Sequence, residues 1–377
     1  MKPYITDNFG NPSGTYDLSI LSAKAIDTAR KQVADVIGAK PEEIIFTSGG
    51  SEADNWALIS QALTHRGGHI ITSKVEHHAI LNTCHALEKL GICTVTYLDV
   101  DKDGRIRLKD LEEAIDNNPD TFMVSIMAAN NELGTIERTK IYGYLCKIRG
   151  VIFHTDAVQA FGHIPINVNE MNIDMLSASA HKIHGPKGVG FLYVRKELQK
   201  SLIPLINGGQ QEYGLRAGTE NVAGIVGLGK AAEIAADEMD VVALKTERMR
   251  EYLIARLSTE IPGINLNGSR YIRLPNNINI TIDGVGGVET VMMLNSYGIC
   301  VSTGSACATS SNEPSHVLTA IGLTPDQANC TIRVTIDDTM TPQDARYFVE
   351  TLEDVVGVIR SMNTHNNEND HTFGGTL

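Results

Sequence analysis

The sequence predicts an α/β fold with a large mixed, mostly parallel sheet and a smaller carboxyl-terminal α+β domain. Short apolar runs alternate with helical patterns between about residue 20 and residue 240. Strands buried on both faces read as continuous apolar runs, and their alternation with helices indicates parallel strands covered by helices. A long, charged helical pattern from about residue 223 to 259 then leads into a second set of strands and helices.

Each expected element follows from a local pattern. The large domain spans residues 9–240 and has strand-like runs at residues 44–47, 69–72, 122–127, 151–154 and 188–194. Helical patterns cover residues 52–63 and begin again at residue 78. The small domain spans residues 241–362, with strands at residues 277–282 and 332–336 and helices near residues 288–295, 316–321 and 343–362. Residues 363–377 are polar and lack periodicity, so we expect a disordered tail.

Composition and charge exclude several classes of function. The 377 residues suffice for two domains and a sizeable core. The net charge of −13 argues against nonspecific nucleic-acid binding, which needs a basic face. No apolar run approaches the roughly 20 residues that span a bilayer, and the first residues lack a signal-peptide core. We therefore expect a cytoplasmic protein that binds neither nucleic acid nor membrane.

The six cysteines are scattered, without the spacing of metal ligands or of a disulfide framework. A reducing compartment is the simplest fit to that pattern, and no metal site is expected. Five cysteines lie on or beside periodic apolar segments and are expected in the core: Cys84, Cys93, Cys146, Cys300 and Cys330. Cys307 instead follows Gly304, Ser305 and Ala306, small residues that are typical of a loop.

Lys182 lies in the most informative stretch of the chain, residues 177–188. It directly follows His181, comes after Ser179 and precedes a Gly-Pro turn, a context that packing explains poorly. An aldehyde cofactor with a phosphate explains it, because the Lys182 amine would form a Schiff base and Ser179 and His181 could reach the phosphate. With Cys307, this favours a pyridoxal phosphate (PLP) enzyme that also uses a thiol. The alternative is a solvated basic loop.

More polar residues follow expected strands, where the active sites of open α/β sheets gather. Gly50 and Ser51 stand between a strand and a helix, so backbone N–H groups and the helix dipole favour a phosphate there. His77 could stack on a flat ring or be an exposed loop histidine. Asp156 could keep a pyridine nitrogen protonated, or could be a helix N-cap. Two further candidates share this placement: Asn131 and Gln159.

Ordered motifs along most of the chain carry a family resemblance. They are Phe9-Gly10-Asn11-Pro12-Ser13, the segment 46–55, Glu76-His77, Asn130-Asn131-Glu132-Leu133-Gly134, Asp156-Ala157-Val158-Gln159, Ser179-Ala180-His181-Lys182, the segment 214–221, Gly304-Ser305-Ala306-Cys307 and Ile332-Arg333. In this order they resemble the class I (NifS/IscS-type) cysteine desulfurases. The resemblance implies a PLP-dependent fold-type I enzyme with the aspartate aminotransferase-like fold, usually a homodimer. It also implies conversion of L-cysteine to L-alanine and an enzyme-bound persulfide.

The resemblance assigns a role to each matching residue around the cofactor. Lys182 would carry PLP, His77 would stack on its ring, Asp156 would pair with the ring nitrogen, and Gln159 would touch the ring hydroxyl. The phosphate would be bound by Gly50, Ser51, Ser179, His181 and, lent by the partner subunit, Thr219. Asn131 would lie beside both cofactor and substrate.

The resemblance also implies how the substrate is handled. Asn11, Asn131 and Arg333 would orient it, with the Arg333 guanidinium forking the amino-acid carboxylate. Cys307 would be the nucleophile, acting as a thiolate on the substrate sulfur. Cys307, Lys182 and His77 are thus the expected catalytic residues. The sulfur would pass to an acceptor protein, such as an iron–sulfur scaffold or a thiolation partner.

The sequence departs from the family pattern in a few places. Family members normally have a further segment before the position of Met1, with an Asp-x-Ala-x-Thr motif beside the active site. Glutamine stands at Gln210, where a third glycine is common, and Asp337-Asp338 replaces a more usual Gly-basic pair. Two alternatives therefore stay open: a selenocysteine lyase or another fold-type I PLP enzyme, and a shortened, catalytically weak homologue that acts as a binding partner.

Overall fold

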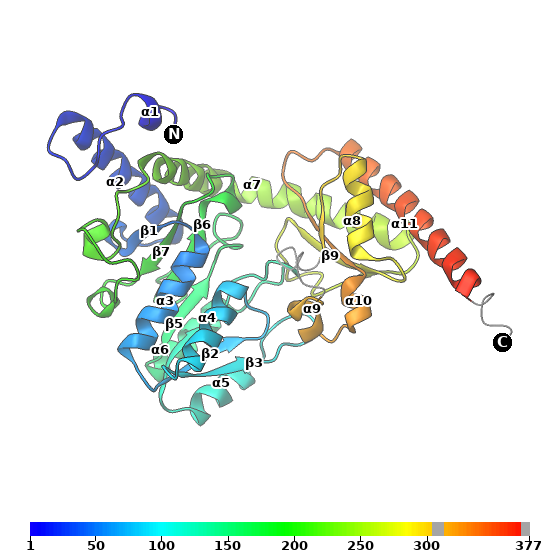
Figure 1. Cartoon of the computed structure of the whole chain (residues 1–377), viewed down its shortest axis with the longest axis horizontal. Helices are drawn as coiled ribbons and strands as arrows, with labels where there is room; N and C mark the ends of the chain where they lie inside the picture. The colour runs from blue at the N-terminus through cyan, green and yellow to red at the C-terminus, as the bar shows by residue number, and fades with distance from the viewer. Residues whose placement is uncertain (304–312, 371–377) are drawn as a thin grey trace. The chain divides into compact units, whose positions relative to one another are not determined.

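The protein divides into two compact units, each with its own sheet (Figure 1). The structure is a computed structural model that describes residues 1–303 and 313–370. The first unit comprises Met1–Asp99, Ile106–Asn130 and Ile136–Met239. The second comprises Val100–Arg105, Asn131–Thr135 and the chain from Asp240 onward. Cys307 lies outside the described residues.

The first unit is built on a seven-stranded sheet with the order β1-β7-β6-β5-β4-β2-β3. Its strands are β1 (Ile44–Thr47), β2 (His69–Ser73), β3 (Thr94–Leu98), β4 (Thr121–Ser125), β5 (Ile152–Asp156), β6 (Met175–Ser179) and β7 (Gly190–Val194). Only β7 runs antiparallel to its neighbours, β1 and β6. The predicted mixed, mostly parallel sheet is therefore confirmed.

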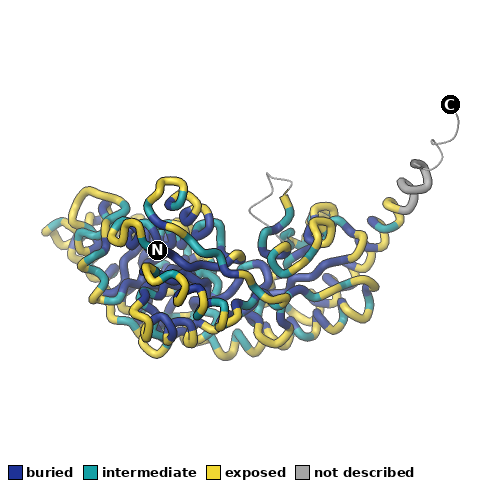
Figure 2. Tube along the Cα trace, turned by 90° about the horizontal axis from the view of Figure 1, so that it is seen from below, coloured by how far each residue is buried: buried dark blue, intermediate teal, exposed yellow. Residues whose placement is uncertain are grey.

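Helices connect and cover these strands. They are α1 (Pro3–Thr6), α2 (Asp17–Ile37), α3 (Gly50–Thr64), α4 (His78–Lys89), α5 (Leu108–Asn117), α6 (Thr139–Arg149) and α7 (Val222–Glu260). Gly38 ends α2 and Gly150 ends α6, both with a left-handed φ (67° and 71°) that glycine adopts without strain. The strands are buried nearly throughout, except for the edge strand β3, which is mostly half-buried (Figure 2).

The direction of the strands places the candidate residues at one edge of the first sheet. Strands β1, β2, β4, β5 and β6 all point the same way, because β1 and β6 are each antiparallel to β7. Their carboxyl ends lead into the segments that hold Gly50, His77, Asn130, Asp156 and Ser179. Ligands of open α/β sheets bind at this edge.

The second unit is built on a four-stranded antiparallel sheet with the order β10-β11-β9-β8. Its strands are β8 (Ile264–Leu266), β9 (Asn277–Ile282), β10 (Ser302–Thr303) and β11 (Thr331–Thr335). Its helices are α8 (Gly287–Ser296), α9 (His316–Ala320), α10 (Pro325–Asn329) and α11 (Pro342–Asp370). Apolar side chains of β9, β11 and α11 form one core with the second half of α7.

The structure corrects two sequence predictions in this unit. Helix α11 runs on to Asp370, so the expected tail is helical from residue 363 to 370. A helix adds one hydrogen bond for each residue that joins it, so a packed helix can extend into polar sequence. Cys300 is exposed and Cys330 is half-buried, whereas both were expected in the core. Cys300 precedes β10, an edge strand of only two residues, which buries little of its flanking chain.

No helix in the described part of the chain is both apolar and long enough to cross a bilayer. Helix α7 has 39 residues, but charged side chains recur along it. It continues from the first unit into the second, whose main segment begins at Asp240.

Candidate active site

The turn between β1 and α3 packs tightly against β7 and against the segment that follows β5. A Cβ on Gly50 would lie 2.5 Å from a methyl of Val158, and one on Gly190 would lie 2.7 Å from the Gly49 Cα. Real Cβ atoms do not approach other atoms this closely, so these positions require glycine. The first N–H groups of α3, a helix of 15 residues, stand at the carboxyl edge of the sheet, where a helix N-terminus favours an anion.

The lysine turn follows β6 directly. Residues Ala180–Ile183 form one 3₁₀ turn, which His184 closes with a left-handed φ of 61°. The Ser179 hydroxyl lies 2.8 Å from Nδ1 of His181, and Nε2 of His163 lies 2.9 Å from the Lys182 carbonyl oxygen. Burial and the Lys182 charge lower the pKa of His181. The turn thus holds a hydroxyl, an imidazole and a half-buried amine within four residues.

Asp156 belongs to a cluster of buried acids beneath this edge of the sheet. The Asp156 side chain is 5% exposed and accepts a hydrogen bond from the Val158 N–H (2.8 Å). Asp54, on α3, is 1% exposed. Burial raises the pKa of both carboxyls; the Asp156 charge raises that of Asp54 further, while the Lys182 charge opposes the rise at Asp156. Because two buried anions repel, a cation placed against Asp156 would stabilise the cluster.

His154 connects this cluster to neighbouring strands. Its Nδ1 lies 2.8 Å from the Ser125 hydroxyl, and its Nε2 lies 3.0 Å from the Ser177 hydroxyl and 3.9 Å from a carboxylate oxygen of Asp54. Burial lowers the pKa of His154 to about 3, so the imidazole is neutral at physiological pH. The His154–Asp54 contact is therefore not an ion pair, and Asp54 is not compensated by it.

His77 lies at the start of α4, where its Nδ1 accepts a hydrogen bond from the Ala79 N–H (3.1 Å). The preceding residue, Glu76, is fully buried and accepts from the Ser73 hydroxyl (2.6 Å) and from the Met127 N–H (3.0 Å). Burial raises the pKa of Glu76 to about 8. These bonds join the loop that carries His77 to the end of β4.

Thr219 is exposed on a segment that is anchored at its other residues. Arg216 pairs with Glu52 of α3 (2.9 Å). Glu212 lies earlier in the same segment and has a positive φ of 47°. The buried Arg30 donates two hydrogen bonds to its carboxylate (2.7 and 2.8 Å). Ion pairs between buried groups hold a loop firmly when both partners are hydrogen-bonded. The segment therefore presents Thr219 from a fixed base.

In the second unit, Arg333 lies at the centre of the sheet, on β11. Its Nη1 donates to the Asn131 carbonyl oxygen (3.0 Å), and the next residue, Glu132, accepts from the Ser315 hydroxyl (2.5 Å). Asn131 and Arg333, both predicted site residues, are thus brought together. Asn11 is exposed, and its described side-chain bond goes to the backbone N–H of Ser13 rather than to another predicted site residue.

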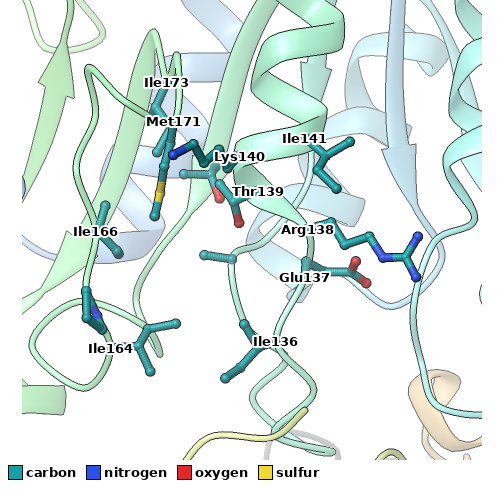
Figure 3. A pocket seen from close by; sticks show the side chains of 13 residues that line it. Ile136, Glu137, Arg138, Thr139, Lys140, Ile141, Ile164, Ile166, Met171 and Ile173 are labelled. Atoms are coloured by element: carbon teal, nitrogen blue, oxygen red, sulfur yellow. The ribbon is translucent and has the colours of Figure 1, made fainter.

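A separate apolar cavity of about 440 Å³ lies in the first unit (Figure 3). Isoleucine and methionine side chains surround it: Ile136, Ile141, Ile164, Ile166, Met171 and Ile173. Thr155 also lines it. Because side chains alternate along a strand, Thr155 and Asp156 face opposite sides of β5. The cavity is therefore distinct from the cluster around Asp156 and Lys182.

Comparison with known proteins now identifies the family. The aminotransferase class-V profile matches residues 1–348. The chain belongs to the aminotransferase class-V family. It is 48% identical over 370 residues to a protein named cysteine desulfurase IscS from Dictyoglomus turgidum, covering 98% of this chain and 93% of the relative.

Solved structures of the family share this fold. A NifS-like protein superposes with a TM-score of 0.88 at 37% identity, covering 95% of this chain and 94% of that chain. A structure described as SspA in complex with cysteine has a TM-score of 0.78 at 40% identity, covering 89% and 93% of the two chains. These likenesses confirm the predicted fold-type I architecture.

Members of the class-V family use PLP, and the residues of the first unit fit that group. The N-terminus of α3 offers backbone N–H groups to a phosphate, and the Ser179 hydroxyl and His181 lie at the same edge of the sheet. Burial destabilises the negative charge of Asp156, so a protonated pyridine nitrogen would be a suitable partner for it. The half-buried Lys182 amine lies close enough for its charge to act on Asp156.

Several buried groups around the two clusters have no role in the predicted site: Asp54, Glu76, Glu132, His154 and Ser315. Asp54, Glu76 and Glu132 lie in the quoted family motifs, but the pattern does not say that they are buried. A signal was available for His154, which stands inside an otherwise apolar strand. A polar residue in such a run must have a partner, so it marks a buried network.

Proposed function

We propose that this protein is a cysteine desulfurase that converts L-cysteine to L-alanine and passes the sulfur to Cys307 as a persulfide. The observation that carries the proposal is the placement of Lys182 in the turn directly after β6, beside the buried Asp156 at the end of the neighbouring strand β5. Full-length relatives named cysteine desulfurase support it, as does a relative described in complex with cysteine.

In this proposal the cofactor residues belong to the first unit. The Gly50 and Ser51 backbone, the Ser179 hydroxyl and His181 hold the phosphate. His77 covers the ring, Asp156 pairs with its nitrogen, and Gln159 bonds its hydroxyl. When bound, PLP supplies an electron sink for the carbanion that forms as the substrate loses a proton. Lys182 carries the cofactor and then moves that proton.

The substrate residues act on the two ends of the amino acid. Arg333 binds the carboxylate with its planar fork, and Asn131 and Asn11 orient the rest. The Cys307 thiolate takes the sulfur: the bond from the substrate β-carbon to sulfur breaks, and a bond from that sulfur to Sγ forms. Protons added to the carbon skeleton complete alanine, so cysteine and a thiol give alanine and a persulfide.

The function test uses the wild-type protein with PLP, L-cysteine and a thiol reductant. We expect alanine and sulfide in equal amounts, because each cysteine that loses its sulfur leaves one alanine. Amino-acid analysis and a sulfide assay measure the two products. Turnover of selenocysteine with none of cysteine would identify a selenocysteine lyase instead, and no turnover of either would contradict the proposal.

We further propose a homodimer in which each subunit lends Thr219 to the phosphate site of the other. The exposed position of Thr219 on its anchored segment supports this arrangement. The sulfur acceptor is proposed to be another protein, such as an iron–sulfur scaffold. The free thiols of the five described cysteines fit a reducing, cytoplasmic compartment, which we propose as its location.

Hybrid dimers test the shared site. If one subunit carries Lys182→Ala and the other Thr219→Ala, one of the two sites keeps both residues, and we expect about half of the wild-type activity. The matched hybrid pairs a wild-type subunit with one that carries both changes, so its only site with a lysine lacks the lent threonine. That hybrid should be much less active at low PLP. Equal activity of the two hybrids would rule out sharing.

A further inference from the structure

The segment Asn131–Thr135 belongs to the second unit although it follows β4 of the first. Successive carbonyl oxygens of this segment accept hydrogen bonds from side chains of the second unit. The pairs are Asn131 with Arg333 (3.0 Å), Glu132 with Asn277 and Asn279 (both 3.2 Å), and Leu133 with Arg273 (2.6 Å). The backbone on both sides of the Glu132 side chain is therefore fixed.

Glu132 is 4% exposed. Its carboxylate interacts with the Ser315 hydroxyl and with the charge of Arg333. The Ser315 hydroxyl donates to Oε2 (2.5 Å), and the same hydroxyl accepts from the Leu318 N–H (3.2 Å) at the start of α9. Burial raises the pKa of Glu132 to about 7, and the Arg333 charge opposes that rise. Contacts place Glu132 beside Arg333: Arg333 donates to the carbonyl oxygen of the preceding residue, Asn131, and Asn279, the register partner of Arg333 on β9, donates to the Glu132 carbonyl oxygen.

We infer that Glu132 is a positioning residue that, with the Asn131 carbonyl, aims the Arg333 guanidinium at the substrate carboxylate. The inference rests on the proposed role of Arg333. A guanidinium binds a carboxylate well only when its fork lies in one plane with it. The bond from Nη1 to Asn131 fixes one arm of Arg333. Glu132 restricts the remaining rotation, and Ser315 holds Glu132.

The inference predicts an effect on binding rather than on turnover. A carboxylate contact is equally strong in the ground state and the transition state, so misaiming Arg333 raises KM and leaves kcat nearly unchanged. For Glu132→Ala we expect KM for L-cysteine to rise about tenfold, equivalent to about 1.4 kcal/mol. Glu132→Gln keeps the acceptor for Ser315 but loses the charge, so its KM should rise less. The rise in KM for Ser315→Ala should lie between those of Glu132→Gln and Glu132→Ala.

The decisive readout is equilibrium binding, measured by calorimetry on the PLP-loaded protein. The probe is 3-mercaptopropanoate, which has the substrate's thiol and carboxylate but no amine to react with the cofactor. Its Kd should rise about tenfold in Glu132→Ala. The Kd of 3-mercaptopropanol, which lacks the carboxylate, should not change. Equal loss of both ligands, or an unchanged Kd for 3-mercaptopropanoate, would overturn the inference.

Two controls separate positioning from structure and from the proposed site. Thr281→Val removes a different buried hydroxyl of the same sheet, which bonds the Thr331 hydroxyl (2.8 Å) and the Asn267 side chain (2.9 Å), and should leave both Kd values unchanged. Thermal unfolding checks that each variant folds. If Glu132→Ala does not fold, Ser315→Ala serves as the milder test. If Arg333→Ala also leaves the Kd of 3-mercaptopropanoate unchanged, the proposed role of Arg333 fails and the inference fails with it. If Arg333→Ala weakens binding and Glu132→Ala does not, the inference alone fails.

Discussion

Protein with Lys182→Ala will not retain PLP covalently when it is reduced with borohydride, whereas the wild-type protein will. Borohydride traps a cofactor only where a primary amine has bonded to its aldehyde, and Lys182 is the amine that acts on the buried Asp156. Alanine production should fall on the order of 10³-fold, because proton transfer by a positioned group contributes that much to a rate. Mass spectrometry of the reduced peptide and an alanine assay measure the two effects.

Lys187→Ala is the matched control for this prediction. Lys187 lies in the same lysine-bearing segment but is exposed, while Lys182 is half-buried. The control variant should trap PLP at the wild-type level. Covalent trapping at that level in Lys182→Ala would show that another lysine carries the cofactor, and the proposed site would be wrong.

Cys307→Ser will abolish alanine production from L-cysteine while the absorbance of bound PLP stays as in the wild-type protein. A serine hydroxyl does not form the nucleophile that a thiolate does, and Lys182 is untouched by the change. After a pulse of L-cysteine, mass spectrometry of the wild-type protein should find one extra sulfur on the peptide that contains Cys307. Cofactor spectra and an alanine assay complete the measurement.

The described cysteines define the control. Burial raises the pKa of the thiols of Cys84, Cys93 and Cys146, so these do not form thiolates readily. Cys300 is exposed and belongs to the same stretch of sequence as Cys307, so Cys300→Ser is the sharpest comparison. That variant should keep full turnover. If turnover is lost in Cys300→Ser and kept in Cys307→Ser, Cys300 carries the sulfur and the proposed mechanism is wrong.

Local sequence patterns were enough to predict most elements of the first unit and the edge of the sheet where the candidate residues lie. Strands such as β4 and β5 are buried on both faces, so their continuous apolar runs can be recognised in the sequence alone. The residue after such a run lies at the carboxyl edge wherever the strand pairs in parallel. The Gly49-Gly50 turn could also be predicted, because a turn from a strand into a helix presents backbone N–H groups that favour a phosphate.

The burial of polar groups, and the partners that stabilise them, became clear from the folded chain and not from its local patterns. Glu132 and Ser315 are 183 residues apart, and their bond exists because the segment Asn131–Thr135 packs in the second unit. Asp54 looks like an ordinary helix residue in the sequence, yet it lies buried near Asp156. Cys300 looked apolar in context but faces solvent beside a short edge strand. Burial depends on contacts between segments far apart in the chain, and a local pattern of residues does not predict those contacts.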